Sequence, residues 1–288
     1  MVVFACIGYL YLLSYAWKEV GCNNLAFYSV SCESLQKVTE FGGSKKGGQK
    51  KVTFNEWGCT EVAVKTIKDS DLELIKYVKA HAYILENLQH PNLVRMLGTC
   101  ENSEGITIVE ESISGSPLSV TKTVYSLSNR MSYAVAISRL ARYFVHSPLG
   151  PLMHCDYIAH NFLVDDEDNL TLIDVDTIWS LRRNNMFKDP SISRLEDGTN
   201  DNEILHRNHD NTGPKECEED NDCAMYCSNS APESKKCNLE TKTCAPFDIR
   251  AFTYTICYDL LKPLLFIKHK QLFETQTPWF LDVLDSCL

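Results

Sequence analysis

The sequence predicts an α+β fold in which a strand-rich first part is followed by a mainly helical second part. Strand-like runs recur through residues 34–110, and EVAVKTI at 61–67 carries the β-branched residues typical of strands. An amphipathic helix interrupts them at residues 71–88, because its apolar residues recur at steps of three and four. Helix-length apolar patterns then occupy residues 132–146 and 247–267.

The composition indicates a globular protein with a sizeable core. Its 288 residues are 44% hydrophobic, enough for one large domain or two small ones. The 38 acidic residues against 28 basic ones give a net charge of -10, which argues against the broad positive surface of a nucleic-acid-binding protein. No internal repeat is visible in the sequence, so a solenoid or propeller is not expected.

Residues 1–20 are expected to form a signal peptide or a signal anchor. Residues 2–17 are almost entirely apolar, which is short for a membrane span and long for a signal-peptide core. The basic segment that usually precedes a signal-peptide core is missing from the sequence. A membrane anchor through residues 2–17 and a buried strand therefore remain alternatives.

The cysteine content indicates an oxidising compartment. Of the 13 cysteines, Cys6 belongs to the apolar leader. The remaining twelve are an even number, which is compatible with complete pairing in disulfides. Five of the others lie close together in a polar stretch: Cys217, Cys223, Cys227, Cys237 and Cys244. Such a stretch has too little apolar surface to fold by burial, so disulfides would supply the constraint. The sequence contains no C-x-x-C pair, which argues against a zinc site.

The elements of the first part follow one another closely. Residues 34–64 alternate apolar patches with the stretch FGGSKKGGQKK, which predicts strands joined by a flexible glycine loop. The tripeptide HPN at 90–92 ends the amphipathic helix, and strand-like runs follow at 93–97 and 106–110.

In the second part, two short strands at 161–164 and 170–173 flank an acidic turn. The acidic run at 165–168 is expected to be a solvated turn; a calcium site is the alternative, although the glycine and the closing glutamate of an EF-hand are absent. The adjoining sequon Asn169-Leu170-Thr171 can carry a glycan only in the secretory pathway. Residues 190–245 are the least core-like region.

The most informative stretch is HCDYIAHNFLVDDEDNLTLIDVD at 154–176. It places Asp156 five residues before Asn161, and Asp174 thirteen residues after Asn161. This spacing resembles the H-R-D-x-x-x-x-N and D-F-G motifs of protein kinases. The resemblance implies that Asp156 orients and deprotonates the acceptor hydroxyl, while Asn161 and Asp174 hold Mg²⁺ or Mn²⁺ on the nucleotide phosphates. His154 is expected to be a packed structural histidine.

Upstream segments extend the resemblance. EVAVKTI resembles the kinase strand whose lysine contacts the α- and β-phosphates of ATP, a role that falls to Lys65. IVEESISGSPL resembles the hinge on which adenine rests, and Glu111 belongs to it. Downstream, DIRAFTYTICYDLL resembles a buried kinase helix that begins with an aspartate, here Asp248, as a structural anchor for the catalytic loop.

The glycine loop departs from the kinase pattern. It is GGSKKGGQKKV in place of G-x-G-x-x-G-x-V, so only the close approach of its backbone to phosphate carries over, to Gly47 and Gly48. Val52 would pack on the base, and Lys50 is a candidate second phosphate contact.

Other departures concern side chains that kinases use. His81 stands where the helix glutamate should pair with the strand lysine, and Glu73 or Glu86 are the possible substitutes. Cys155 replaces the arginine of H-R-D, which argues against control by a phosphorylated activation loop. Asp176 replaces the glycine of D-F-G and adds a carboxylate, and no A-P-E motif is visible.

The combination of HCD, D-V-D and late cysteines resembles the divergent kinases of the secretory pathway: the divergent protein kinase domain proteins, the vertebrate lonesome kinase and protein O-mannose kinase. SCESLQKV and FVHSPLG are most similar to protein O-mannose kinase, whereas the cysteine cluster fits the divergent kinase domain proteins. The resemblance implies a bilobal protein-kinase-like fold. Residues 32–112 would form an antiparallel-sheet N-lobe, and residues 113–288 a reduced helical C-lobe with a disulfide-rich insertion at 214–246.

The same resemblance implies the function. We expect transfer of the ATP γ-phosphate to a hydroxyl of a luminal or extracellular protein, in the endoplasmic reticulum, the Golgi or outside the cell. Two alternatives remain open: a catalytically inactive pseudokinase that acts as a binding module, and a glycan kinase of the O-mannose type.

Overall fold

A computed structural model describes the following parts of the chain: residues 30–35, 39–46, 51–57, 60–68, 72–102, 105–121, 125–180, 185–186, 217–220, 237–244 and 249–266. The predicted leader at 2–17, Gly47, Gly48, Lys50 and Asp248 lie outside them. Within these ranges, no helix is long and apolar enough to cross a bilayer. The chain divides into two compact units, Met1–Val78 with Arg95–Ser112, and Lys79–Val94 with Ile113–Leu288.

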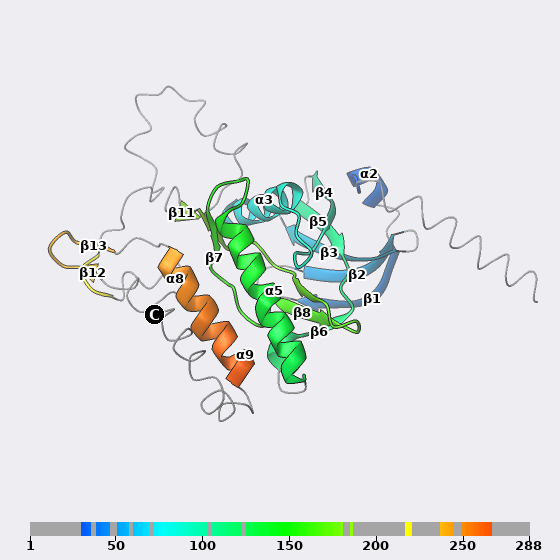
Figure 1. Ribbon diagram of the computed structural model, residues 1–288. Coiled ribbons are helices and arrows are strands. Elements are labelled where there is room, and N and C mark those ends of the chain that lie inside the picture. Colours follow the sequence, from blue (N-terminus) through cyan, green and yellow to red (C-terminus); the bar gives the residue numbers. More distant parts are fainter. Residues whose placement is uncertain are drawn as a thin grey trace, which may run out of the picture. The chain divides into compact units, whose positions relative to one another are not determined.

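The first unit contains an antiparallel sheet and a short helix (Figure 1). Its elements are α2 (Cys32–Leu35), β1 (Thr39–Lys46), β2 (Lys51–Trp57), β3 (Thr60–Lys68), β4 (Met96–Asn102) and β5 (Gly105–Glu111). Among the described residues these strands form a five-stranded sheet in the order β1-β2-β3-β5-β4, with every neighbouring pair antiparallel. The predicted antiparallel sheet is confirmed.

The two faces of this sheet differ in character because side chains alternate along a strand. One face carries Val62, Val64 and Val109, which pack with Trp57 and Val30 in a buried apolar cluster. Lys65 and Glu110, which follow Val64 and Val109 in the chain, therefore stand on the opposite face. Both side chains are buried.

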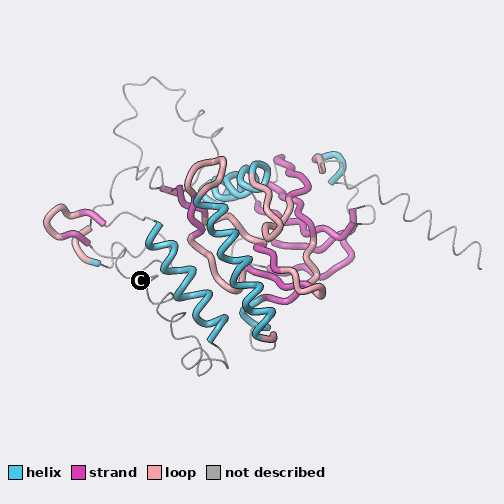
Figure 2. The backbone as a smooth tube through the Cα atoms, viewed as in Figure 1, coloured by secondary structure: helices cyan, strands magenta, loops and turns pink. Residues whose placement is uncertain are grey.

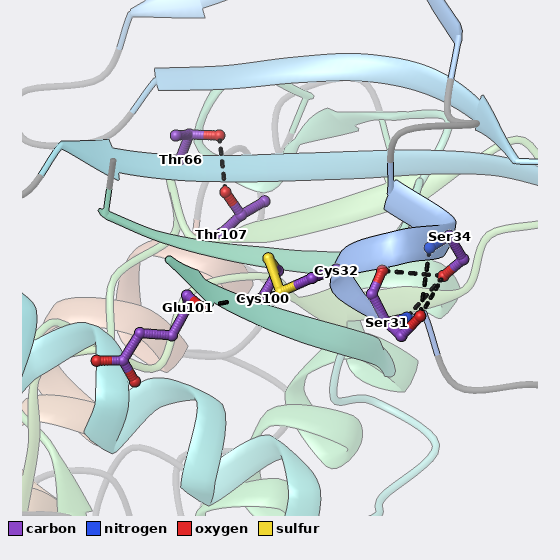
Figure 3. Close-up of a disulfide and its surroundings, with 7 residues drawn as sticks. All are labelled: Ser31, Cys32, Ser34, Thr66, Cys100, Glu101 and Thr107. Atoms are coloured by element: carbon purple, nitrogen blue, oxygen red, sulfur yellow. Dashed lines mark hydrogen bonds between the residues drawn. A yellow bond between two sulfur atoms is a disulfide. The ribbon is translucent and has the colours of Figure 1, made fainter. Parts of the chain in front are cut away.

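The segment before β1 is fastened to the edge strand β4. The backbone N–H of Val30 donates to the Leu97 carbonyl at 2.7 Å, and Val30 forms a parallel bridge with Gly98. A Cβ at Gly98 would collide with the Val30 carbonyl, so only glycine allows this approach. Just beyond, a disulfide joins Cys32 of α2 to Cys100 of β4, as Figure 3 shows. The segment thus covers the part of β4 that it bridges, where an exposed edge would invite pairing with another chain.

Removal of the Cys32–Cys100 bond should destabilise the first unit. The bond links residues 68 positions apart, and closing a loop of that size restricts the unfolded chain. We expect Cys32→Ser/Cys100→Ser to lose about 2–4 kcal/mol of unfolding free energy. Urea unfolding measures this loss, with the reduced wild-type protein as the comparison. An unfolding midpoint equal to that of the oxidised wild type would contradict the fold described here.

Helix α3 (Leu72–Asn87) passes from the first unit into the second. The other helical elements of the second unit are α4 (Leu118–Thr121), α5 (Leu127–Val145), α8 (Ile249–Tyr254), the π-helix η3 (Thr255–Leu261) and α9 (Lys262–Phe266). Its strands are β6 (Gly115–Pro117), β7 (Leu152–His154), β8 (Phe162–Asp165), β9 (Leu170–Leu172), β10 (Ile178–Ser180), β11 (Asn185–Met186), β12 (Cys237–Asn238) and β13 (Thr243–Cys244). The described strands form small sheets, β6-β8-β9, β11-β10-β7 and β12-β13.

Helix α5 is the central helix of the second unit and runs beside α8, η3 and α9 (Figure 1). It begins five residues before the start predicted at 132, because Ser126 caps it: the Ser126 Oγ accepts a hydrogen bond from the Asn129 N–H. Ile137, Leu140 and Phe144 are fully buried along one stripe. The amphipathic pattern therefore identified the helix, while its first turn depends on the cap.

The last described helix contains a π turn that the apolar pattern did not predict. The N–H of Lys262 donates to the carbonyl of Cys257, five residues earlier, and Pro263 follows. Proline has no N–H and its ring collides with the carbonyl four residues back in an α-helix, so a wider turn before it relieves the conflict.

The strand predicted at 93–97 is wrong in its first half. Strand β4 begins at Met96, whereas Val94 donates its N–H to the Leu172 carbonyl and Leu93 bridges Leu172. These residues pair with β9 of the second unit before the chain enters the sheet of the first.

The cysteine-rich stretch contains disulfides, as predicted. Cys217 is bonded to Cys237, and Cys244 is also in a disulfide. Cys223 and Cys227 lie outside the described residues. The observed elements confirm the α+β class.

Candidate active site

A loop, of the kind drawn in pink in Figure 2, joins β7 to β8. It brings Asp156 and Asn161 together. The Asn161 side-chain nitrogen donates to the Asp156 carbonyl and to its carboxylate Oδ2, both at 2.9 Å. Two backbone bonds, from Ile158 to Asp156 and from Asn161 to Ile158, form the intervening turns. Because both bonds use the side-chain amide nitrogen, neither occupies the side-chain oxygen Oδ1 of Asn161, which can still bind a cation.

His154 links this loop to the segment that carries Asp174. Its Nδ1 accepts a hydrogen bond from the backbone N–H of Asp156 at 3.0 Å, and its Nε2 lies 2.6 Å from the Asp174 carbonyl oxygen. An acceptor at Nδ1 and a carbonyl facing Nε2 together require the neutral tautomer with its proton on Nε2. His154 is thus the structural histidine that the sequence predicted, and both of its ring nitrogens position a candidate site residue.

The environment of His154 favours this neutral form. The side chain is 1% exposed and lies among aromatic rings, with Phe144 6.3 Å and Tyr157 5.8 Å away between ring centroids. Burial lowers the pKa of His154, and the Asp174 carbonyl and the nearby carboxylates of Asp174, Asp176 and Asp156 oppose that shift only in part.

Two backbone bonds reinforce the connection between these loops. The Cys155 N–H donates to the Thr177 carbonyl at 2.8 Å, and the Ile173 N–H donates to the Asn161 carbonyl at 2.9 Å. Cys155, which stands in the place of the kinase arginine, is 7% exposed and disulfide-bonded. A disulfide therefore holds the position at which kinases carry the arginine that pairs with a phosphorylated activation loop.

Asp174 is contacted by His81 of helix α3. The His81 Nδ1 lies 3.4 Å from the Asp174 Oδ1, and the His81 side chain is fully buried. The residue in the place of the helix glutamate thus contacts a candidate metal ligand. Of the two substitutes considered from the sequence, Glu86 is exposed and the side chain of Glu73 lies outside the described residues.

Lys65 has a carboxylate partner in its own sheet. Its Nζ lies 2.8 Å from the Glu110 Oε2, and the two side chains are 9% and 1% exposed. The sequence analysis missed Glu110 as a site residue. Ile106, Ile108 and Glu110 follow one another at two-residue steps and share one face of β5, which was the available signal. The pairing of β3 with β5 then puts this face beside Lys65.

Two further candidates lie in the same unit. Val52 is half-buried on β2 and pairs directly with Lys65, so it adjoins the lysine as a base-packing residue would. Glu111 uses its carboxylate to accept from the Arg95 N–H at 2.8 Å, and its own N–H donates to the Arg95 carbonyl. These bonds position the carboxylate and the N–H of Glu111, and its contact with a nucleotide base stays a prediction.

The acidic turn at 165–168 is held by internal hydrogen bonds. The Asp165 Oδ1 accepts from the N–H groups of Glu167 and Asn169, and Asp168 accepts from the Tyr133 hydroxyl at 2.9 Å. This geometry favours the structural turn over the calcium site.

The donor set suits a nucleotide-bound divalent cation. In the described part of the chain, no three His, Cys, Asp or Glu side chains converge on one metal position. Magnesium in phosphoryl-transfer enzymes needs fewer protein ligands, because phosphate and water oxygens complete its coordination beside one or two protein oxygens. Asn161 and Asp174 supply an amide oxygen and a carboxylate of this type and would hold such an ion.

Comparison with known proteins identifies the family. Residues 35–189, which are 155 of the 288 residues, match the protein tyrosine and serine/threonine kinase family. This chain belongs to the protein kinase family. Kinases as a group use ATP and a divalent metal ion, and the α+β fold described above is a protein-kinase fold.

Individual kinases resemble the chain at low identity. The RasGEF domain-containing serine/threonine-protein kinase X of Dictyostelium discoideum is 30% identical over 166 residues, 55% of this chain and 16% of that protein. The wall-associated receptor kinase-like 14 of Arabidopsis thaliana is 26% identical over 196 residues, 63% of this chain and 26% of that protein. The tyrosine protein-kinase src-1 of Caenorhabditis elegans is 30% identical over 118 residues, 40% of this chain and 22% of that protein. The chain thus matches about a quarter or less of each relative.

The lowered pKa of His154 makes the stability of the protein depend on pH. An unfolded histidine titrates near pH 6.5, whereas folded His154 stays neutral to lower pH. Between these values only the unfolded chain binds the proton, so the free energy of unfolding falls as the pH falls below about 6.5. His154→Gln should be less stable than wild type at neutral pH, and the difference should narrow toward acid pH. Urea unfolding across this range measures it, and a difference independent of pH would contradict a neutral buried imidazole.

Proposed function

We propose that this chain is an atypical kinase of the secretory pathway that transfers the γ-phosphate of ATP to a hydroxyl of a luminal or extracellular protein. The observation that carries the proposal is the buried His154, which holds Asp156 with its bound Asn161 and the backbone of Asp174 in one arrangement. Phosphoryl transfer requires little covalent chemistry and accurate placement of charge, and this arrangement supplies placement.

Each of these residues has a distinct task in the proposed reaction. Asp156, oriented by the Asn161 amide, positions the acceptor hydroxyl and takes its proton. Asn161 and Asp174 would hold Mg²⁺ or Mn²⁺, which when bound neutralises charge on the phosphates. Lys65 contacts the α- and β-phosphates as the corresponding lysine does in kinases.

The disulfides support the assignment to the secretory pathway. Structural disulfides persist in oxidising compartments and are rare in the cytosol, and this chain has them in both units. The phrases similar to protein O-mannose kinase and the late cysteines support a proposed membership among the divergent secretory kinases.

Two substitutions test the chemistry. Asp156→Asn removes the proton acceptor and Asp174→Asn weakens the metal site, so each should lower phosphate transfer at least about 100-fold. Transfer from radiolabelled ATP to luminal extract, with Mg²⁺ or Mn²⁺, measures the effect. Asp166→Asn, in the exposed acidic turn, is the matched control and should retain full activity. Unchanged transfer in the Asp156 and Asp174 variants would contradict the assignment.

The second candidate function is a non-catalytic binding module, and His81 in the place of the helix glutamate favours it. Thermal unfolding in the presence of ATP and Mg²⁺ separates the two, because a ligand that binds the folded state raises the unfolding temperature. The kinase assignment predicts a rise that depends on both nucleotide and metal. A module that binds no nucleotide shows none. A glycan kinase would instead transfer phosphate to a mannose-containing acceptor and to no peptide.

The compartment has its own test. Protein secreted from cells and digested without reduction should yield a disulfide-linked peptide pair containing Cys217 and Cys237. Free thiols at both positions would refute the luminal assignment, whatever the catalytic result.

A further inference from the structure

The ion pair of Lys65 and Glu110 lies entirely within one sheet. Strands β3 and β5 pair Lys65 with Ile108 and Ala63 with Glu110, so the lysine and the glutamate stand on the same face as diagonal neighbours. The ladder between the strands runs without a break from Val62 opposite Glu111 to Lys68 opposite Gly105. The pairing of the two strands therefore fixes where the two side chains start on this face.

The burial of this pair calls for an explanation. At 9% and 1% exposure, both side chains have lost most of their hydration, which carries a large free-energy penalty for each ion. Apolar residues of similar volume usually stabilise such a site as well or better. The pair is thus a poor device for stability, and its geometry is better suited to orienting one of its members.

We propose that Glu110 is the residue that positions Lys65 for the nucleotide phosphates. This inference rests on the proposed kinase function. In kinases a glutamate of the regulatory helix holds this lysine, and the position of that helix controls whether the pair forms. Here the helix carries His81, which contacts Asp174, and Glu110 of β5 holds the lysine in its place. Glu110 thus supplies a carboxylate for the lysine from within the sheet.

The experiment compares ATP with adenosine on the full chain. Glu110→Gln keeps the shape of the side chain and removes its charge, so Lys65 loses the partner that orients it. Because Lys65 acts on phosphates, we expect ATP with Mg²⁺ to bind about tenfold more weakly, as for the loss of a charged hydrogen bond. Adenosine has no phosphate, so its affinity should stay within about twofold, inside the scatter of such measurements. Thermal unfolding titrations report both affinities.

The comparison separates positioning from a structural effect. A general distortion of the sheet would weaken the binding of adenosine and of ATP alike, and that result overturns the proposal. Unchanged or tighter ATP binding overturns it as well. Glu56→Gln, an exposed carboxylate on β2 of the same sheet, is the matched control and should bind both ligands as the wild type does.

A second variant serves if Glu110→Gln does not fold. Glu110→Asp keeps the charge that Lys65 needs in the folded state but shortens the side chain by one methylene, which lengthens the 2.8 Å contact. It should weaken ATP binding about threefold, less than the loss of a full charged hydrogen bond would, and leave the affinity for adenosine unchanged. An Asp variant that binds ATP as tightly as the wild type overturns the proposal. If the wild-type protein binds neither ligand, the proposed kinase function is contradicted. That outcome differs from one in which only the Glu110 variants fail to behave as expected.

Discussion

The candidate active site depends on one buried imidazole. His154 accepts from the backbone of Asp156 and faces the carbonyl of Asp174, so a single side chain sets the relation between two loops that are remote in sequence. Loops are normally the most mobile parts of a fold, yet catalysis requires the groups that they carry to be held closely. Burial among aromatic rings keeps the imidazole neutral, and only the neutral form can accept at one nitrogen and donate at the other.

In the sheet of the first unit, side chains alternate between an apolar face and a face that carries charged residues. One face supplies the apolar cluster around Val62, Val64 and Val109, and the other carries Lys65 and Glu110. The apolar face provides the burial that fixes the strands, and fixed strands then hold two charges at a defined distance. The disulfide between Cys32 and Cys100 fastens the preceding segment to the edge of this sheet, where a short helix alone would have few contacts (Figure 3). In this chain Lys65 pairs with Glu110, and Asp174 is contacted by His81.

The features that were predictable from the sequence are mostly local. The five-residue spacing of Asp156 and Asn161 closes a turn, and the structure brings the two side chains together. The amphipathic helices and the strand EVAVKTI follow from periodicity and propensity alone. The sequence also indicated that His81 could not replace a glutamate, although not what His81 would contact.

The features that were missed arise from pairing between distant segments or from backbone detail. Glu110 meets Lys65 only because β3 and β5 pair in one particular register, and a shift by one residue would place the carboxylate on the other face. The early start of α5 depends on the Ser126 cap, and the π turn before Pro263 depends on a backbone conflict that apolar periodicity does not record. The partner of Cys32 could not be chosen from its spacing, since an even set of cysteines allows many pairings.

The most direct test of the account is a crystal structure of the chain with a non-hydrolysable ATP analogue and Mn²⁺, recorded so that the anomalous signal locates the metal. The account predicts a manganese peak bound by the Asn161 side-chain oxygen and the Asp174 carboxylate, with Lys65 on the nucleotide phosphates and still paired with Glu110. A peak at other residues, or an analogue held without contact to Lys65, would contradict it.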